Sequence, residues 1–190
     1  MALKSNIRRT AGETLFSDTV QKIAADIESF LSPADKIIDL GSGTCLFTKL
    51  FREKGYDVTP VDISNKSYYP AITPLVYDGK KLPFKDNEFD VCMLIAVLHH
   101  TPDPEVVLRE AMRVAKKLVI MEDAITNVFQ RYYSYLLDSI LNKEFFGHPH
   151  TNKTDEQWQE LFQKLGLTLV KREHKTAWLF LSNPMYYLTK

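Results

Sequence analysis

Asp39-Leu40-Gly41-Ser42-Gly43-Thr44-Cys45 is the stretch that decides the fold of this 190-residue chain. The run from Lys36 to Leu40 predicts a short buried strand, and Leu46 opens an apolar helical face after the two glycines. A second expected strand, Val58 to Ile63, brings a carboxylate at Asp62 to its end. A strand, a glycine turn, a helix and an acid-tipped strand in this order indicate a binding site for an adenosine-containing cofactor.

The rest of the chain continues this alternation of strand and helix patterns. Apolar residues recur at helical spacing from Phe16 to Leu31, and Asp103-Pro104 is typical of a helix start. Thr154 to Gln157 forms a capping box before another helix. The further strands that we expect are Pro74–Tyr77, Phe89–Val97, Leu118–Met121, Leu167–Glu173 and Ala177–Leu181.

The last two of these strands are close enough in the sequence to form an antiparallel hairpin, with His174 at its turn. Strands that alternate with helices predict a parallel sheet with right-handed crossovers. The predicted fold is therefore α/β, with a seven-stranded and mostly parallel sheet, helices on both faces and a C-terminal antiparallel hairpin.

Composition and charge narrow the class of protein. Hydrophobic residues make up 45% of the chain and charged residues 25%, as in an ordinary globular protein with one core. Basic and acidic residues balance at 24 each, so no long-range field favours nucleic acid as a partner. No apolar segment is long enough to predict a secretory signal or a stable membrane insertion. Two isolated cysteines suit a reducing compartment, so a cytoplasmic location is expected.

The residues around the glycines separate two kinds of adenosine cofactor. A dinucleotide fingerprint needs a further glycine at position 46, where this chain has Leu46. Asp39 would repel a diphosphate but would favour a ligand that carries ammonium and sulfonium groups. Asp62 suits a ribose diol in either case, because a carboxylate accepts two hydrogen bonds. The pattern therefore disfavours NAD.

Four blocks of the sequence then occur in a characteristic order: Ile38–Thr44, Pro60–Ile63, Asp78–Phe84, and Phe89–Val91 leading to Val97–Pro104. With them the chain resembles the class I S-adenosylmethionine-dependent methyltransferases of the small-molecule type, in particular the group related to the ubiquinone and menaquinone C-methyltransferases. The resemblance runs from about Asp35 to Glu122, with a looser match to the C-terminal hairpin. It implies a Rossmann-like fold, S-adenosyl-L-methionine as cofactor, S-adenosyl-L-homocysteine as product and a small-molecule acceptor.

The resemblance also implies a role for each matching position. Asp39 would hold the methionine amino group, Asp62 the ribose diol, and Asp78 the adenine amino group. The glycines would let the backbone pass beside the cofactor, and Ala96 and Val97 would line its methionine part. The complete set of expected cofactor-binding residues is Asp39, Gly41, Ser42, Gly43, Asp62, Ile63, Asp78, Gly79, Ala96 and Val97.

Two positions depart from the family pattern. Cys45 stands where a third loop glycine is usual, and its small side chain is expected to pack there. Between Asp62 and Pro74 there is little room for the usual second crossover helix, and Tyr68-Tyr69-Pro70 argues against one.

Histidines supply the candidate bases, which methyl transfer needs only when the acceptor is a hydroxyl or a carbon acid. The candidates are His99, His100 and His150, with His148 beside the last. A plainer interpretation remains open for each, since the first pair can simply cap the fourth strand and Pro149 can fix a turn. No metal site is predicted, because no carboxylate lies at ligand spacing from these histidines.

The segment after the fifth strand is the part of the chain that bears on the acceptor. Glu122 and Asp123 could hold a cationic acceptor or cap the helix that follows. An apolar stripe from Ile125 to Leu141 predicts a helix that packs on the sheet, and its surplus aromatic residues favour an apolar or aromatic acceptor.

We therefore predict one methyltransferase domain over residues 1–190. It has an N-terminal helical segment (1–34), a cofactor-binding half (35–122) and an acceptor-side region (123–190). Two alternatives stay open: a cofactor-binding but non-catalytic subunit that activates a partner, and, disfavoured by the zero net charge, methylation of RNA or protein.

Overall fold

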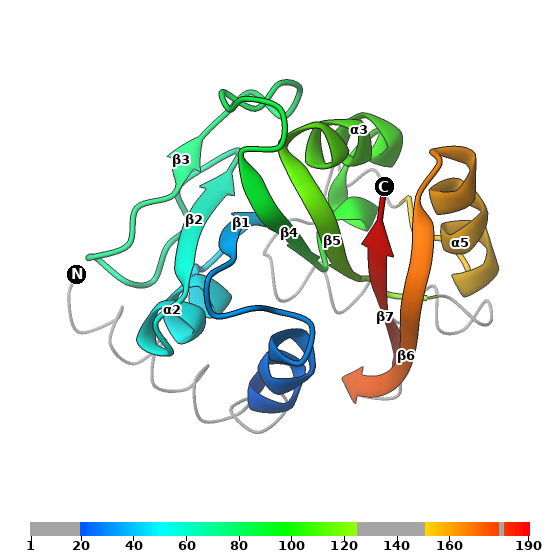
Figure 1. The fold of residues 1–190 in the computed structure, drawn as a ribbon, viewed down its shortest axis with the longest axis horizontal. Helices are drawn as coiled ribbons and strands as arrows, with labels where there is room; N and C mark the ends of the chain where they lie inside the picture. The colour runs from blue at the N-terminus through cyan, green and yellow to red at the C-terminus, as the bar shows by residue number, and fades with distance from the viewer. Residues whose placement is uncertain (1–19, 125–150, 179–180) are drawn as a thin grey trace, which may run out of the picture.

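The computed structural model describes residues 20–124, 151–178 and 181–190, and in this part of the chain seven strands form one sheet in the order β3-β2-β1-β4-β5-β7-β6 (Figure 1). Strands β1 to β5 run parallel to one another, and β7 runs antiparallel to both β5 and β6. This confirms the predicted fold. The strands are β1 (Lys36–Leu40), β2 (Asp57–Asp62), β3 (Leu75–Val76), β4 (Phe89–Ile95), β5 (Ala115–Met121), β6 (Thr168–Trp178) and β7 (Leu181–Thr189).

Helices cover both faces of the sheet (Figure 1). They are a helix over residues 20–28, α2 (Leu46–Glu53), α3 (Pro104–Val114) and α5 (Asp155–Lys164). Alternate residues of one strand serve opposite faces, as the strand period of two requires. On β4, Cys92 and Leu94 pack in the cluster that contains α3 and α5. Val91 and Met93 pack instead with α2 and the 20–28 helix.

The predicted helix starts have the expected capping bonds. Asp103 accepts the N–H of Glu105 at 3.0 Å in front of Pro104. At α5, Thr154 Oγ1 accepts the N–H of Gln157 at 3.3 Å, and the Gln157 side chain accepts the N–H of Thr154 at 3.0 Å. These bonds satisfy N–H groups that have no partner inside the helix, so local sequence alone sets both boundaries.

The C-terminal hairpin is longer than its sequence pattern indicates. The prediction that His174 lies at the turn and that the second strand covers Ala177–Leu181 is wrong. Position 174 is paired in β6 with Pro184, and β7 begins only at Leu181. The pairing of β7 with β5 reaches only to Met185, so Pro184 pairs with β6 alone, and a proline is tolerated where a strand has a single partner.

The connections near the site differ from the expectations only in detail. As expected, residues 63–74 contain no helix, and β3 is reduced to two residues. The strand expected to run to Val97 ends at Ile95, and Leu98–His100 forms a short 3₁₀ turn, η1. The apolar stripe from Ile125 onward, together with His148 and His150, lies outside the described residues. No helix in the described part of the chain is both long and apolar enough to cross a membrane.

Candidate active site

The glycine loop is bonded to the end of β2, the strand beside it. The N–H groups of Gly41 and Ser42 both donate to Val61 O, at 2.8 and 3.1 Å. The next amide, that of Gly43, donates to Asp62 Oδ2 at 2.8 Å. The loop therefore folds over the carboxyl end of β2, at the edge of the sheet where open α/β folds bind their ligands.

Gly41 has no room for a side chain. Its φ is +78°, and a Cβ at this position would lie 2.6 Å from Cγ2 and 2.7 Å from Cγ1 of Val97. At Gly43, with φ +50°, a Cβ would meet nothing closer than a backbone oxygen at 4.0 Å. One glycine thus allows the turn to pack against the end of β4, while the other leaves the loop backbone open to a ligand.

Asp62 accepts a backbone hydrogen bond on each of its carboxylate oxygens. Its Oδ2 accepts from Gly43, and its Oδ1 accepts the N–H of Ser64 at 3.1 Å. Each oxygen keeps further acceptor capacity, because a carboxylate offers about four lone-pair sites. The next residue, Ile63, has 66% of its surface exposed beside Gly79 and so provides an apolar platform at the strand end. An acid beside an exposed apolar side chain fits a ribose that carries a flat base.

Asp39 is buried beneath the loop rather than exposed at the strand end. Its Oδ2 accepts a hydrogen bond of 2.5 Å from the hydroxyl of Thr48, a buried residue of α2. Burial raises the pKa of the Asp39 carboxyl from 3.8 to about 6, with a smaller contribution from the charge of Asp62, and the bonds from Thr48 oppose the rise. A cation above the loop would lower the pKa of Asp39 again and favour its ionised form.

Asp78 occupies a different environment. Its side chain is exposed, and Oδ1 accepts the N–H groups of Lys80 and Lys81 at 2.9 and 3.0 Å. These backbone bonds lower the pKa of its carboxyl. Asp78 therefore stabilises the turn after β3 through Oδ1. The contact of its other oxygen with an adenine amino group stays a prediction.

Cys45 keeps the conformation that a glycine would adopt. It has φ +61° and ψ +25°, it is buried, and its thiol lies 3.6 Å from Ser42 Oγ. A non-glycine residue in this left-handed region costs about 1–2 kcal/mol. The loop fold therefore survives the departure from the family pattern.

The turn after β4 forms the second wall of the site. Ala96 has φ +56° and donates its N–H to Met121 O at 2.8 Å. After it, the Val97 and Leu98 amides donate to Glu122 Oε1 at 2.9 and 2.6 Å. The His99 ring nitrogen Nδ1 lies 2.5 Å from Glu122 Oε2, and both side chains are buried.

This arrangement answers the question that the sequence leaves open at Glu122. The Glu122 carboxylate is enclosed by the turn after β4, which leaves it no exposed oxygen for a cationic acceptor, and the helix that it was expected to cap lies outside the described residues. Asp123, beside it, accepts from the side-chain amide of Asn183 in β7. No sequence signal could have found the role of Glu122, since its partners lie 23 to 25 positions away.

Two of the three candidate bases fall in the described part of the chain. The rings of His99 and His100 are in contact, with centroids 3.9 Å apart, but only His100 is partly exposed. His150 lies outside the described residues. The hydroxyl of the next residue, Thr151, donates to the carbonyls of Leu98 and Thr101 at 3.2 and 3.1 Å. Residue 151 therefore lies against η1, the 3₁₀ turn that contains His99 and His100.

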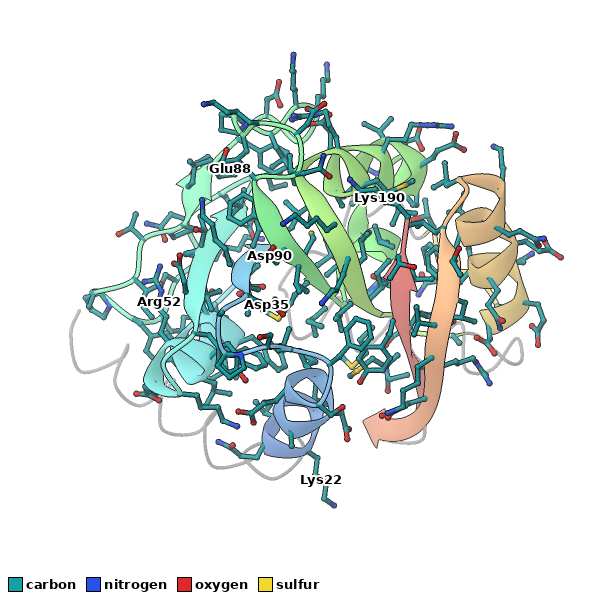
Figure 2. The ribbon with its side chains drawn as sticks, viewed as in Figure 1. Lys22, Asp35, Arg52, Glu88, Asp90 and Lys190 are labelled. Carbon is teal, nitrogen blue, oxygen red and sulfur yellow. The ribbon has the colours of Figure 1, made fainter. Side chains whose placement is uncertain are left out.

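Carboxylates at the amino ends of the strands are paired within the protein. Asp90 accepts the N–H of Lys36 at 3.0 Å and binds Lys116 at 2.7 Å, and Glu88 binds the Lys36 ammonium at 3.2 Å. Figure 2 labels Glu88 and Asp90 at the start of β4. The acids at the carboxyl ends, Asp39 and Asp62, accept instead from the Thr48 hydroxyl and from backbone amides, and suit a cationic ligand better.

Residues 38–120 match a family model described as a methyltransferase domain. Demethylmenaquinone methyltransferases are similar over the same region: that of Streptomyces griseus is 37% identical over 109 residues, covering 53% of this chain and 46% of the relative. That of Streptomyces avermitilis is 35% identical over 99 residues, covering 47% and 43%. The chain thus spans about half the length of the curated relatives it matches.

Solved methyltransferases share the fold over nearly the whole chain. A putative methyltransferase of Haloferax volcanii, solved in complex with the Trm112 methyltransferase activator, superposes with a TM-score of 0.72 at 15% identity, covering 99% of this chain and 96% of the other. An S-adenosylmethionine-dependent methyltransferase of Methanosarcina mazei gives 0.66 at 22% identity, covering 86% and 96%.

The seven-stranded fold and the glycine loop agree with the match of residues 38–120 to a methyltransferase domain. Over this region the chain is similar to the demethylmenaquinone methyltransferases.

Proposed function

We propose that this chain transfers a methyl group from S-adenosylmethionine to a small apolar or aromatic acceptor, with a reduced quinone as the leading candidate. The observation that carries the proposal is the Gly43–Asp62 bond, which holds the glycine loop over an acid beside the exposed Ile63. The similarity to demethylmenaquinone methyltransferases supports the acceptor class.

The protein's part in the reaction is to bind and orient. A bound sulfonium supplies an electrophilic methyl carbon, whose bond to sulfur breaks as the bond to the acceptor forms. Asp62 would bind the ribose hydroxyls with its remaining acceptor capacity, and Ile63 would pack on the adenine. Asp39 would favour the methionine ammonium through its charge, since one of its oxygens already accepts from Thr48. Orientation of this kind contributes more than any acid or base when the electrophile is already activated.

A hydroxyl or carbon-acid acceptor must also lose a proton. We assign this proton to His100, because its imidazole is the more exposed one in the described turn, whereas His99 is buried against Glu122. Replacement of His100 by Ala is expected to lower kcat by about 100-fold, as for other positioned bases, and to leave the affinity for S-adenosylhomocysteine unchanged. A kcat equal to that of the unaltered chain would remove His100 from this role.

The test uses the isolated chain. Calorimetry with S-adenosylmethionine and S-adenosylhomocysteine measures cofactor binding. Mass spectrometry then follows methyl transfer to a panel of short-chain demethylmenaquinol, naphthols and catechols. Binding of the cofactor followed by methylation of an aromatic acceptor is the expected result. A chain that binds neither ligand would overturn the proposal.

The alternative of a non-catalytic subunit has a distinct outcome in the same test. Cofactor binding without methylation of any panel member would favour it. Two sequence features favour this alternative: the absence of an assured base, and the altered loop position Cys45, which the structure shows in the left-handed conformation of the expected glycine. The intact loop geometry therefore supports the catalytic proposal.

A further inference from the structure

Glu122 is bound by more hydrogen bonds than any other carboxylate at the carboxyl ends of the described strands. It lies directly after β5, is fully buried, and accepts the amides of Val97 and Leu98 at Oε1. Its other oxygen, Oε2, lies 3.4 Å from the His99 amide nitrogen and 2.5 Å from the His99 ring. Burying a carboxylate costs free energy because the group must be removed from water. Its hydrogen bonds to the turn must offset that cost.

Its partners form the wall that the glycine loop packs against. The methyl groups of Val97 occupy the space that a side chain at Gly41 would fill. On the other side of the same peptide, Ala96 is held in the left-handed region at φ +56°, which costs about 1–2 kcal/mol. A strained residue persists only where its surroundings over-determine it. Here the surroundings are Met121 O, which accepts the Ala96 amide, and Glu122, which accepts the next amide.

We propose that Glu122 is a positioning residue for the cofactor: by holding the amides of Val97 to His99, it keeps Ala96 left-handed and Val97 seated against Gly41. It touches neither the cofactor nor the acceptor. Its effect on binding is carried through Val97 to the glycine loop. The proposal rests on the proposed function for the identity of the cofactor, and it assigns to Glu122 a role different from acceptor binding.

Glutamine is the substitution at position 122 that tests the hydrogen bonds most directly. Glu122→Gln keeps the volume but leaves one acceptor oxygen where the turn needs two, and it directs an amide N–H₂ group at another N–H. Glu110→Gln is the matched control. The Glu110 carboxylate also accepts a loop amide, that of Leu82 at 2.8 Å, and its other hydrogen bonds come from Arg113 rather than from the turn that packs against the glycine loop.

Calorimetry with S-adenosylhomocysteine and thermal unfolding are measured together for each variant. Glu122→Gln is expected to weaken binding about tenfold or more, a loss of about 1.4 kcal/mol per factor of ten. Glu110→Gln is expected to lower Tm while binding changes less than twofold. Adding Ala96→Gly to Glu122→Gln is expected to recover part of the lost affinity, because glycine adopts a positive φ without strain. A purely structural Glu122 would show no such recovery.

A second variant covers the case in which Glu122→Gln does not fold. Val97→Ala removes the methyl groups that meet Gly41 and leaves Glu122 in place, so it is expected to weaken S-adenosylhomocysteine binding as well. Unchanged binding in Val97→Ala, or affinity losses in Glu122→Gln no larger than in Glu110→Gln, would overturn the proposal. If the unaltered chain binds no cofactor, the proposed function itself fails, which is a different result.

Discussion

The hydroxyl of Thr48 donates a hydrogen bond of 2.5 Å to Oδ2 of Asp39, and both residues are buried beneath the glycine loop. This bond joins the first helix after the loop to the end of β1. Because burial holds the pKa of Asp39 near 6, the carboxylate is mostly ionised at neutral pH but close to titrating. The bond and the titration can be tested separately.

Removal of the Thr48 hydroxyl should destabilise the fold. In Thr48→Val the Asp39 carboxylate stays buried and loses its side-chain donor, which costs about 1–3 kcal/mol. Urea unfolding at pH 7 measures the loss, and Thr48→Ser, which keeps a hydroxyl, is the control. Equal free energies of unfolding for Thr48→Val and the unaltered chain would show that the bond is not stabilising.

Asp39 should also make stability depend on pH. Its pKa is about 6 in the fold and 3.8 when unfolded, so between these values the folded state binds more protons. The free energy of unfolding therefore falls as pH rises from about 4 to 6 and is level above that, as far as this group contributes. Asp39→Asn should remove this part of the profile. An unchanged slope in Asp39→Asn between pH 4 and 6 would contradict the assignment.

The affinity for the cofactor should rise with pH, over the range in which the free energy of unfolding falls. A cationic ligand over the loop favours ionised Asp39, so binding releases a proton when the pH is below 6. With a pKa of about 6, the affinity for S-adenosylmethionine is expected to be about tenfold higher at pH 7 than at pH 5. Calorimetry in buffers of different ionisation enthalpy detects the released proton. A pH-independent affinity would show that Asp39 does not sense the ligand.

Asp62 should carry more of the cofactor affinity than any acid at the opposite edge. Asp62→Ala removes the partner of the Gly43 amide and the acceptor for the ribose, and a loss of about 100-fold in S-adenosylhomocysteine binding is expected. Asp90→Ala is the control, because Asp90 also accepts a backbone amide, that of Lys36, but at the amino end of the strands. Similar affinity losses in the two variants would mean that the effect is only one of stability.

Gly41 should tolerate no side chain while Val97 is present. Gly41→Ala puts a Cβ 2.6 Å from Val97 Cγ2 at a φ of +78°, so both the clash and the backbone strain lower Tm. The double variant with Val97→Ala removes the clash but not the strain, and it is expected to recover part of the loss. Thermal unfolding compares the two variants. A double variant with a Tm no higher than that of Gly41→Ala would indicate that Val97 is not the obstacle.

Prediction from sequence succeeded where a signal is local. Lys36–Leu40 is a strand with the predicted bounds, and the capping box at Thr154 begins α5 as expected. It failed at the C-terminal hairpin, where Asn183-Pro184 is typical of a break but lies inside β7. Pairing with β6 at these two positions, and with β5 from Met185 onward, outweighs the local preference, and the pairing with β5 depends on a segment far away in the sequence.

The candidate site divides in the same way. Asp62 and the glycines were predicted at the strand ends where they lie, because loop chemistry and strand order place them there. The burial of Asp39 and its bond to Thr48 were not predicted, since they depend on how α2 packs on the sheet. The roles of these residues toward the cofactor, and the division of residues 1–190 into three regions, stay predictions.

By itself the sequence determined the order of strands and helices along the chain and the position of the glycine loop, because these follow from periodicity and turn chemistry. Only the tertiary structure decided that the turn after β4 encloses the Glu122 carboxylate and that Val97 fills the space beside Gly41. These contacts join residues that are 24 to 56 positions apart. No local pattern records them, since each exists only once the sheet has brought the ends of β1, β4 and β5 together.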